Sequence, residues 1–120
     1  MEFMNKTAIA SGAASGMGLL FSQCWAEAGG NVIMCDVNEA VLTEKVSGIN
    51  AKNGGRAVGV ICDVRDYAQV VSACDRAVSE FGSIDILCNF AGGTAVRMLG
   101  VDPTLEFPDI PMMYSTGALM

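Results

Sequence analysis

The sequence predicts an α/β protein built around a parallel sheet. Four short apolar stretches alternate along the chain with three segments whose apolar residues recur at helical spacing, and glycines mark most of the turns between them. The apolar stretches are continuous, which is typical of parallel strands covered by helices on both faces. Because crossovers between parallel strands are right-handed, we expect an incomplete three-layer, doubly wound sheet of about four strands.

Composition and charge limit the possible functions. The 120 residues allow one domain, and 52% hydrophobic with 17% charged residues is the composition of a folded core. A formal net charge of −6 argues against partners such as nucleic acid or an anionic membrane, since both require a basic surface. The sequence has neither an apolar run long enough to span a membrane nor a signal peptide, so we expect a cytoplasmic protein.

The five cysteines are expected to be reduced core residues. Their number is odd, they are widely spaced within apolar stretches, and no Cys-x-x-Cys pair suggests a metal or redox site. They are Cys24, Cys35, Cys62, Cys74 and Cys88.

The first strand is predicted over residues 7–10. The helix that follows it is stopped by Gly29-Gly30. Its expected apolar face consists of Met17, Leu20, Phe21, Cys24, Trp25 and Ala28.

The same pattern then recurs. Residues 32–35 form a second apolar run closed by Asp36, and Asn38 can cap a helix that ends at the Asn-Gly-Gly of residues 53–55. This helix is expected to bury Leu42, Val46 and Ile49.

A third strand is predicted over residues 57–62 and a fourth over 84–90. Between them, Asp66 and Gln69 form an acceptable capping box for a helix that ends at Gly82. The expected apolar face of this helix consists of Tyr67, Val70, Val71, Cys74, Val78 and Phe81.

A glycine-rich segment, residues 11–18, joins the first strand to the first helix. Gly12 would allow a tight turn, Gly16 would let the backbone approach a phosphate, and Gly18 would let helix and strand pack closely. The helix N-terminus supplies unpaired N–H groups, and the hydroxyls of Ser11 and Ser15 can add donors. The spacing G-x-x-x-G-x-G is a variant of the Rossmann dinucleotide fingerprint. The alternative is a glycine-rich connection that simply turns sharply.

Asp36 favours NAD over NADP as the cofactor. It ends the second strand about twenty residues after the glycines, where a carboxylate can accept both ribose hydroxyls and would repel a 2′-phosphate. Neither the glycine loop nor Val37 offers a lysine or arginine for an extra phosphate. The alternative is that Asp36 only starts the turn toward Asn38.

With these motifs, residues 5–92 resemble the N-terminal half of the short-chain dehydrogenase/reductase family. The family's glycine pattern is met by the three glycines above, and its Asp-Val after the third strand by Asp63-Val64. The resemblance implies that the Asp63 carboxylate binds the adenine amino group and that the adjacent backbone shapes the adenine pocket. The alternative for Asp63 is a plain role at the start of a helix.

The family's Asn-Asn-Ala-Gly after the fourth strand resembles Asn89-Phe90-Ala91-Gly92, with Phe90 as a departure. Asp85 also fits the family pattern, and a strand-ending turn is the alternative role for Asn89. The complete set of expected cofactor-binding residues is Gly12, Ser15, Gly16, Met17, Gly18, Asp36, Val37, Asp63, Val64, Asn89, Ala91 and Gly92.

The resemblance implies catalysis by a serine, a tyrosine and a lysine four residues after the tyrosine. Tyr67 is followed at that distance by Val71, and Tyr114 by Ala118, and no lysine occurs after Lys52. We therefore identify no catalytic residues and expect this chain alone to be inactive in hydride transfer.

The two ends of the chain are expected to lie outside the fold. Glu2-Phe3 is what a common cloning site encodes, which suggests a vector scar before Met4. Residues 93–120 hold all three prolines, and a reading frame shifted by two bases could turn the last nine residues into a string resembling the family's next helix. The hypothesis is a truncated gene product: a scar over 1–3, a Rossmann half-domain over 4–92 and a loop or tail over 93–120.

The leading functional interpretation is the nucleotide-binding portion of an NAD-dependent oxidoreductase that acts on an alcohol or carbonyl. The alternative is a non-catalytic binding or oligomerisation module. A different Rossmann-like nucleotide binder, such as a methyltransferase, is disfavoured by the motifs at residues 63–64 and 89–92. Ile84, Ile86 and Leu87 would lie on an open sheet edge, which predicts self-association.

Overall fold

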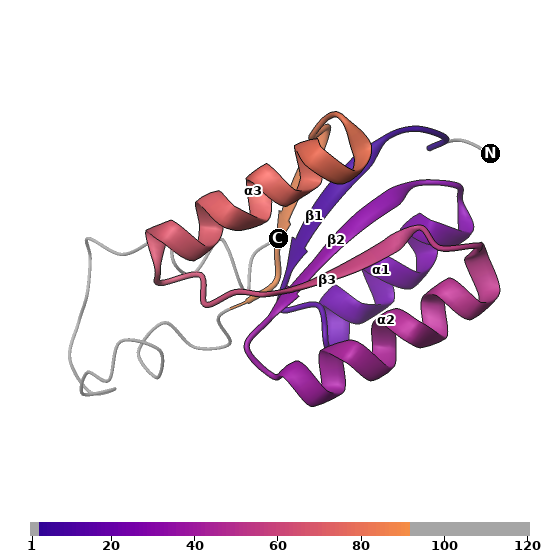
Figure 1. Ribbon diagram of the computed structural model, residues 1–120. Helices are drawn as coiled ribbons and strands as arrows, with labels where there is room; N and C mark the ends of the chain where they lie inside the picture. The colour runs from indigo at the N-terminus through magenta and orange to yellow at the C-terminus, as the bar shows by residue number, and fades with distance from the viewer. Residues whose placement is uncertain (1–2, 92–120) are drawn as a thin grey trace, which may run out of the picture.

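The computed structural model describes residues 3–91 as a parallel sheet between two layers of helices (Figure 1). Residues 1–2 and 92–120 lie outside the described part, and with them Gly92 and the expected tail. The elements in chain order are β1 (Thr7–Ser11), α1 (Gly16–Glu27), β2 (Asn31–Asp36), α2 (Glu39–Asn53), β3 (Ala57–Ile61), α3 (Tyr67–Phe81) and β4 (Ile86–Asn89).

The strand order is β3-β2-β1-β4, and every neighbouring pair is parallel. Helices α1 and α2 cover one face of the sheet and α3 covers the other (Figure 1). One buried cluster unites the first two helices with the sheet, and a second unites the sheet with Ala73 and Ala77 of α3. The predicted three-layer, doubly wound architecture with about four strands is therefore confirmed.

The central strands explain the continuous apolar runs of the sequence. All five residues of β1 are buried, and the interior of β2 contributes Val32, Ile33, Met34 and Cys35 to the core. Successive side chains of a strand point to opposite faces, so a strand covered on both faces favours apolar residues at consecutive positions, as in the interior of both strands.

The predicted helix caps are present. The Asn38 side chain accepts a hydrogen bond from the Val41 amide, and that of Asp66 accepts from the amides of Ala68 and Gln69. These bonds pair backbone donors that would otherwise have no partner in the first helical turn. The boundaries of α2 and α3 therefore follow directly from the sequence.

The predicted apolar face of α3 is partly wrong. Val70, Cys74 and Phe81 pack partly buried against the sheet, but Tyr67, Val71 and Val78 are exposed. The residues that lie deepest are two alanines, Ala73 and Ala77. Small side chains let the helix approach the sheet closely, and the apolar arc is wider than the sheet can cover, so its far edge remains at the surface.

The predicted face of α1 needs the same correction. Trp25 is buried, but its companions toward the sheet are the small residues Gly18, Ser22 and Ala26. Met17, Leu20 and Cys24 were expected in the core but are exposed. All five cysteines are free thiols; Cys35 and Cys62 are buried, and Cys74 and Cys88 are half-buried.

A line of aromatic side chains runs along α1. Phe3 stacks on Trp25 with ring centroids 4.3 Å apart, Trp25 lies 5.5 Å from Phe21, and Phe21 lies 5.8 Å from Phe90. The Phe3 amide also donates to the Ala28 carbonyl. Phe3 therefore contributes to the packing of α1, although the sequence assigns it to a vector scar.

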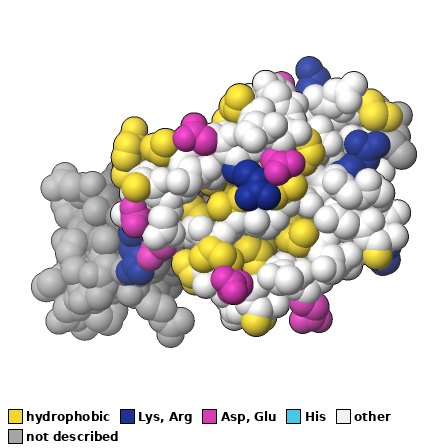
Figure 2. Space-filling model, viewed as in Figure 1, with side chains coloured by type: hydrophobic (Ala, Val, Ile, Leu, Met, Phe, Trp, Pro, Cys, Tyr) yellow, Lys and Arg dark blue, Asp and Glu magenta, His cyan; other side chains and the backbone are white. Residues whose placement is uncertain are grey.

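Exposed apolar residues lie at the β4 side of the sheet. Among the described strands, β4 pairs with β1 alone, which leaves its other edge open. Ile84, Ile86 and Leu87 are 40%, 39% and 58% exposed. Figure 2 shows one face of the molecule, where apolar side chains reach the surface among scattered charges.

No helix within residues 3–91 is long and apolar enough to cross a membrane.

Candidate nucleotide-binding site

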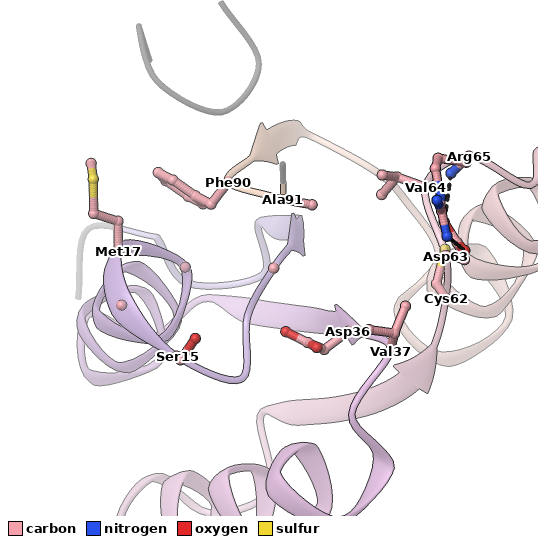
Figure 3. Close-up of a pocket in the computed structure, with 13 residues that line it drawn as sticks. Ser15, Met17, Asp36, Val37, Cys62, Asp63, Val64, Arg65, Phe90 and Ala91 are labelled. Carbon is pink, nitrogen blue, oxygen red and sulfur yellow. Dashed lines mark hydrogen bonds and ion pairs between the residues drawn. The ribbon is translucent and has the colours of Figure 1, made fainter. Parts of the chain in front are cut away.

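An open pocket of about 530 Å³ lies at the carboxyl ends of the strands (Figure 3). After β3 the chain crosses to the other side of β1 to form β4, and ligands of open α/β sheets bind at such a reversal of strand order. The pocket is lined by Gly12, Ser15, Gly16, Met17, Gly18, Asp36, Val37, Cys62, Asp63, Val64, Arg65, Phe90 and Ala91.

The pocket brings together all but two of the residues expected to bind a cofactor. Asn89 is not part of the lining, and Gly92 lies outside the described residues. Three lining residues were not expected: Cys62, Arg65 and Phe90. Cys62 and Arg65 flank the Asp63-Val64 motif, and Phe90 stands where the family motif has an asparagine. The motifs therefore did not indicate these three side chains.

Two glycines of the loop have no room for a side chain. Gly12 has a φ of +66°, and a Cβ there would lie 2.7 Å from the Ala91 nitrogen. A Cβ on Gly18 would collide with the carbonyl oxygen of Gly12. The loop therefore packs directly against the end of β4 and the first turn of α1. By contrast, nothing in the described part of the chain lies within 4 Å of a Cβ built on Gly16, so the backbone there is open to the pocket.

The N-terminus of α1 forms one wall of the pocket. Gly16, Met17 and Gly18 are its first residues, and within residues 3–91 the Ser15 side chain makes no capping hydrogen bond. The first amides of a helix have no carbonyl partner within the helix, and its dipole places partial positive charge at this end. This wall is suited to an anion such as a phosphate.

Asp36 connects three segments around the pocket. Its Oδ2 accepts a hydrogen bond from the Ala14 amide at 3.0 Å, and its Oδ1 accepts one from the Asn38 amide at 3.1 Å. A backbone hydrogen bond from the Ala13 amide to the Cys35 carbonyl also ties the loop to β2. The bond to Asn38 is the turn contact that the sequence offered as an alternative role for Asp36.

Asp63 and Arg65 form an ion pair at the other end of the pocket (Figure 3). The Arg65 Nη2 donates to Asp63 Oδ2 at 2.7 Å, while Nε and the backbone amide of Arg65 both donate to Oδ1, at 3.0 and 2.9 Å. These hydrogen bonds from Arg65 lower the pKa of Asp63 to about 2. The cap of α3 is Asp66, so the helix-start role considered for Asp63 belongs to Asp66.

The ends of β1 and β4 are joined through one hydroxyl. Ser11 Oγ donates to Asn89 Oδ1 at 3.2 Å and accepts from the Ala91 amide at 3.3 Å. The Phe90 amide also donates to the Ser11 carbonyl. Asn89 therefore does not line the pocket but helps to fix the end of β4, which is followed by Phe90 and Ala91.

The described residues offer no metal centre. No group of three or more histidine, cysteine, aspartate or glutamate side chains in this part of the chain could hold a metal ion. Tyr67 is 82% exposed and does not line the pocket, and Tyr114 lies outside the described residues.

Comparison with known proteins gives a consistent result. A family model described as short chain dehydrogenase matches residues 6–110. The chain is 36% identical over 92 residues to 1-deoxy-11-beta-hydroxypentalenate dehydrogenase of Streptomyces exfoliatus, covering 77% of this chain and 33% of that protein. It is 41% identical over 91 residues to galactitol 2-dehydrogenase of Agrobacterium fabrum, covering 76% and 34%.

Solved structures show the same likeness. A short chain dehydrogenase/reductase of Burkholderia phymatum in complex with NAD matches with a TM-score of 0.72 and 37% identity, over 77% of this chain and 32% of that one. L-sorbose reductase of Gluconobacter frateurii, complexed with NADPH and L-sorbose, matches with a TM-score of 0.71 and 30% identity, over 75% and 34%. The chain thus spans about a third of the length of these proteins.

Proposed function

Because the chain belongs to the short-chain dehydrogenase family, we propose that its pocket binds the adenosine and pyrophosphate part of a nicotinamide cofactor, NAD. The observation that carries this proposal is the meeting of the glycine loop, Asp36 and Asp63 around a single pocket. Residues 4–92 are then the nucleotide-binding portion of a cytoplasmic oxidoreductase that acts on an alcohol or carbonyl.

The pyrophosphate is assigned to the glycine loop and the start of α1. The wall formed by Gly16, Met17 and Gly18 combines backbone donors with the positive end of the helix dipole. The absence of a Cβ at Gly16 lets a phosphate approach the backbone. The adenine is assigned to the other end of the pocket, beside Asp63 and Val64.

The preference for NAD over NADP rests on Asp36. Its carboxylate lies in the pocket between the glycine loop and Val37, where it can accept ribose hydroxyls in addition to its backbone bonds, since each oxygen has two lone pairs. A 2′-phosphate placed there would be repelled. The cation in the lining, Arg65, is paired with Asp63. Bound NAD would supply the hydride-transfer chemistry, and the residues that line the pocket would hold the NAD molecule.

Self-association through β4 is proposed as a second property. Among the described strands, the outer edge of β4 has no pairing partner, and Ile84, Ile86 and Leu87 are exposed beside it. Sedimentation of the wild type and of Leu87→Lys tests it. The wild type is expected to sediment as an oligomer that the added charge dissociates, and a monomeric wild type would exclude this property.

Calorimetric titration with NAD, NADP and adenosine diphosphate ribose tests the cofactor proposal. We expect NAD and adenosine diphosphate ribose to bind and NADP to bind at least about tenfold more weakly. Asp75→Asn on the exposed surface of α3 is a matched control for changes at Asp36, because it removes an equal charge away from the pocket. A folded protein that binds none of the three would instead favour a non-catalytic module.

A further inference from the structure

Within residues 3–91, Arg65 is the one cation in the lining of the pocket, and the sequence motifs do not account for it. We infer that Arg65 determines which base the pocket accepts, by holding the Asp63 carboxylate as a fixed acceptor for an exocyclic amino group. The inference rests on the proposed binding of a dinucleotide and assigns Arg65 a positioning role in its adenine pocket.

The geometry of the pair fixes the Asp63 side chain. In the described part of the chain, Asp63 Oδ1 accepts two N–H groups of Arg65, from the backbone and from Nε, whereas Oδ2 accepts one, from Nη2. A carboxylate offers about four lone pairs, so Oδ2 retains the capacity to accept a further donor. The Asp63 side chain is 28% exposed, and Asp63 is one of the residues that line the pocket.

The backbone of Asp63 is fixed as well. Its amide donates to Gln69 Oε1 at 2.8 Å, and Gln69 Nε2 donates to Asp66 Oδ2 at 3.0 Å. Asp66 in turn caps α3. Asp63 is therefore held at both ends, by Arg65 through its carboxylate and by the start of α3 through its amide. A group fixed in this way binds without the entropic cost of being ordered by its ligand.

The chemistry of the bases makes this arrangement selective. An ionised carboxylate can only accept hydrogen bonds, and the charge of Arg65 opposes its protonation. Adenine presents an amino group at C6, which donates. Hypoxanthine presents a carbonyl at that position, whose lone pairs would face those of Oδ2. If Asp63 could rotate away, the pocket would lose this distinction.

A second ion pair, within helix α3, provides a matched control. Arg76 Nε donates to Glu80 Oε1 at 2.9 Å, and the two side chains are 48% and 40% exposed. The Arg65 side chain is 55% exposed, so both arginines form pairs at the surface. Arg76 does not line the pocket. Loss of either pair therefore removes one exposed arginine, but only loss of the Arg65 pair changes the proposed base contact.

The test is calorimetric titration with NAD and with nicotinamide hypoxanthine dinucleotide, using the wild type, Arg65→Gln, Arg65→Lys and Arg76→Gln. Circular dichroism and thermal unfolding establish that each variant is folded. We expect the wild type to prefer NAD at least about tenfold, Arg65→Gln to lose most of that preference, and Arg76→Gln to retain it. Arg65→Lys should lie between them, since lysine keeps the charge but cannot make the two-armed contact.

Two results would overturn the inference in different ways. If Arg65→Gln is folded and retains the wild-type preference for NAD, or if the wild type binds the two dinucleotides equally, Arg65 does not determine the base and the proposed NAD site stands. If the folded wild type binds neither dinucleotide, the proposed function fails and the inference fails with it.

Discussion

The Asp36 carboxylate accepts a hydrogen bond from the backbone amide of Ala14, 22 positions earlier in the chain, at 3.0 Å. The residue expected to recognise the ribose therefore also fastens the glycine loop to the end of β2. The geometry of the glycine loop and the proposed recognition of the ribose thus both depend on the Asp36 side chain. Substitutions that remove the charge of Asp36 but keep its hydrogen bond to Ala14 can distinguish these two contributions.

Asp36→Asn keeps an acceptor for the Ala14 amide and removes the charge, whereas Asp36→Ala removes both. For Asp36→Asn we expect about tenfold weaker NAD binding and a smaller discrimination against NADP, because the repulsion of a 2′-phosphate is lost. For Asp36→Ala we expect weak binding of both dinucleotides, because the loop is released. Calorimetry measures both, with Asp75→Asn as the control. Equal behaviour of the two variants would contradict a role for Asp36 in holding the loop.

Gly18→Ala is expected to destabilise the fold by about 1–3 kcal/mol, because its Cβ would collide with the Gly12 carbonyl oxygen. Gly48→Ala is the matched comparison within a helix. Nothing in the described part of the chain lies within 4 Å of a Cβ at Gly48, so this change should stabilise α2 by about 0.5–1 kcal/mol. Urea unfolding measures both values, and a Gly18→Ala protein as stable as wild type would refute the close packing of loop and helix.

Acid should destabilise the protein partly through Asp85. Hydrogen bonds from the Thr7 amide at 2.8 Å and then from the Ser83 hydroxyl lower the pKa of Asp85 below its ordinary value of 3.8. The unfolded state therefore binds this proton more tightly than the folded state. The contribution of Asp85 to stability is present above pH 4 and is lost as the pH falls through the folded pKa.

Asp85→Asn tests this dependence in urea unfolding experiments at pH 6, 4 and 3. The variant should be less stable than wild type at pH 6, and the difference should narrow at pH 3. A constant difference between the two proteins across this range would show that Asp85 does not act through its charge.

Ser11→Ala should cost about 1–2 kcal/mol of the free energy of unfolding. The Ser11 hydroxyl serves both Asn89 Oδ1 and the Ala91 amide, and its loss leaves two polar groups without this partner at a position where Ser11 is 4% exposed. Ser11→Thr keeps the hydroxyl and should restore most of the stability. Urea unfolding is the measurement, and an unchanged midpoint for Ser11→Ala would show that the junction of β1 and β4 does not depend on this hydroxyl.

The sequence was sufficient for the order of elements because each signal is local. Continuous apolar runs, the caps at Asn38 and Asp66, and the breaks at glycines depend on neighbours in the chain. Which side of a helix faces the sheet depends instead on the shape of the sheet surface against which the helix packs. The large side chains of Met17 and Val78 suggested the core, whereas the small residues Ala73 and Ala77 in fact permit the closest approach.

The pocket was predicted in outline for the same reason. Parallel strands bring their carboxyl ends to one edge, and the motif residues that follow those strands line one pocket there. The pairing of Asp63 with Arg65 and the bond from Ala14 to Asp36 could not be read from spacing, because they depend on side-chain rotamers and on loop geometry. Phe90 could be recognised only as a departure from a motif, and its contact with Phe21 came from the fold.

The row of rings that begins at Phe3 gives the molecule an optical probe of its own. Trp25 is the only tryptophan in the sequence, it is 8% exposed, and its indole N–H donates to the Asn31 carbonyl. Its fluorescence therefore comes from one shielded site and should shift to longer wavelength when the chain unfolds. Two ring contacts, through Phe21 to Phe90, connect that site to the wall of the pocket. The same emission can thus follow folding without an added label, and we expect it to change through Phe90 when a nucleotide occupies the proposed site.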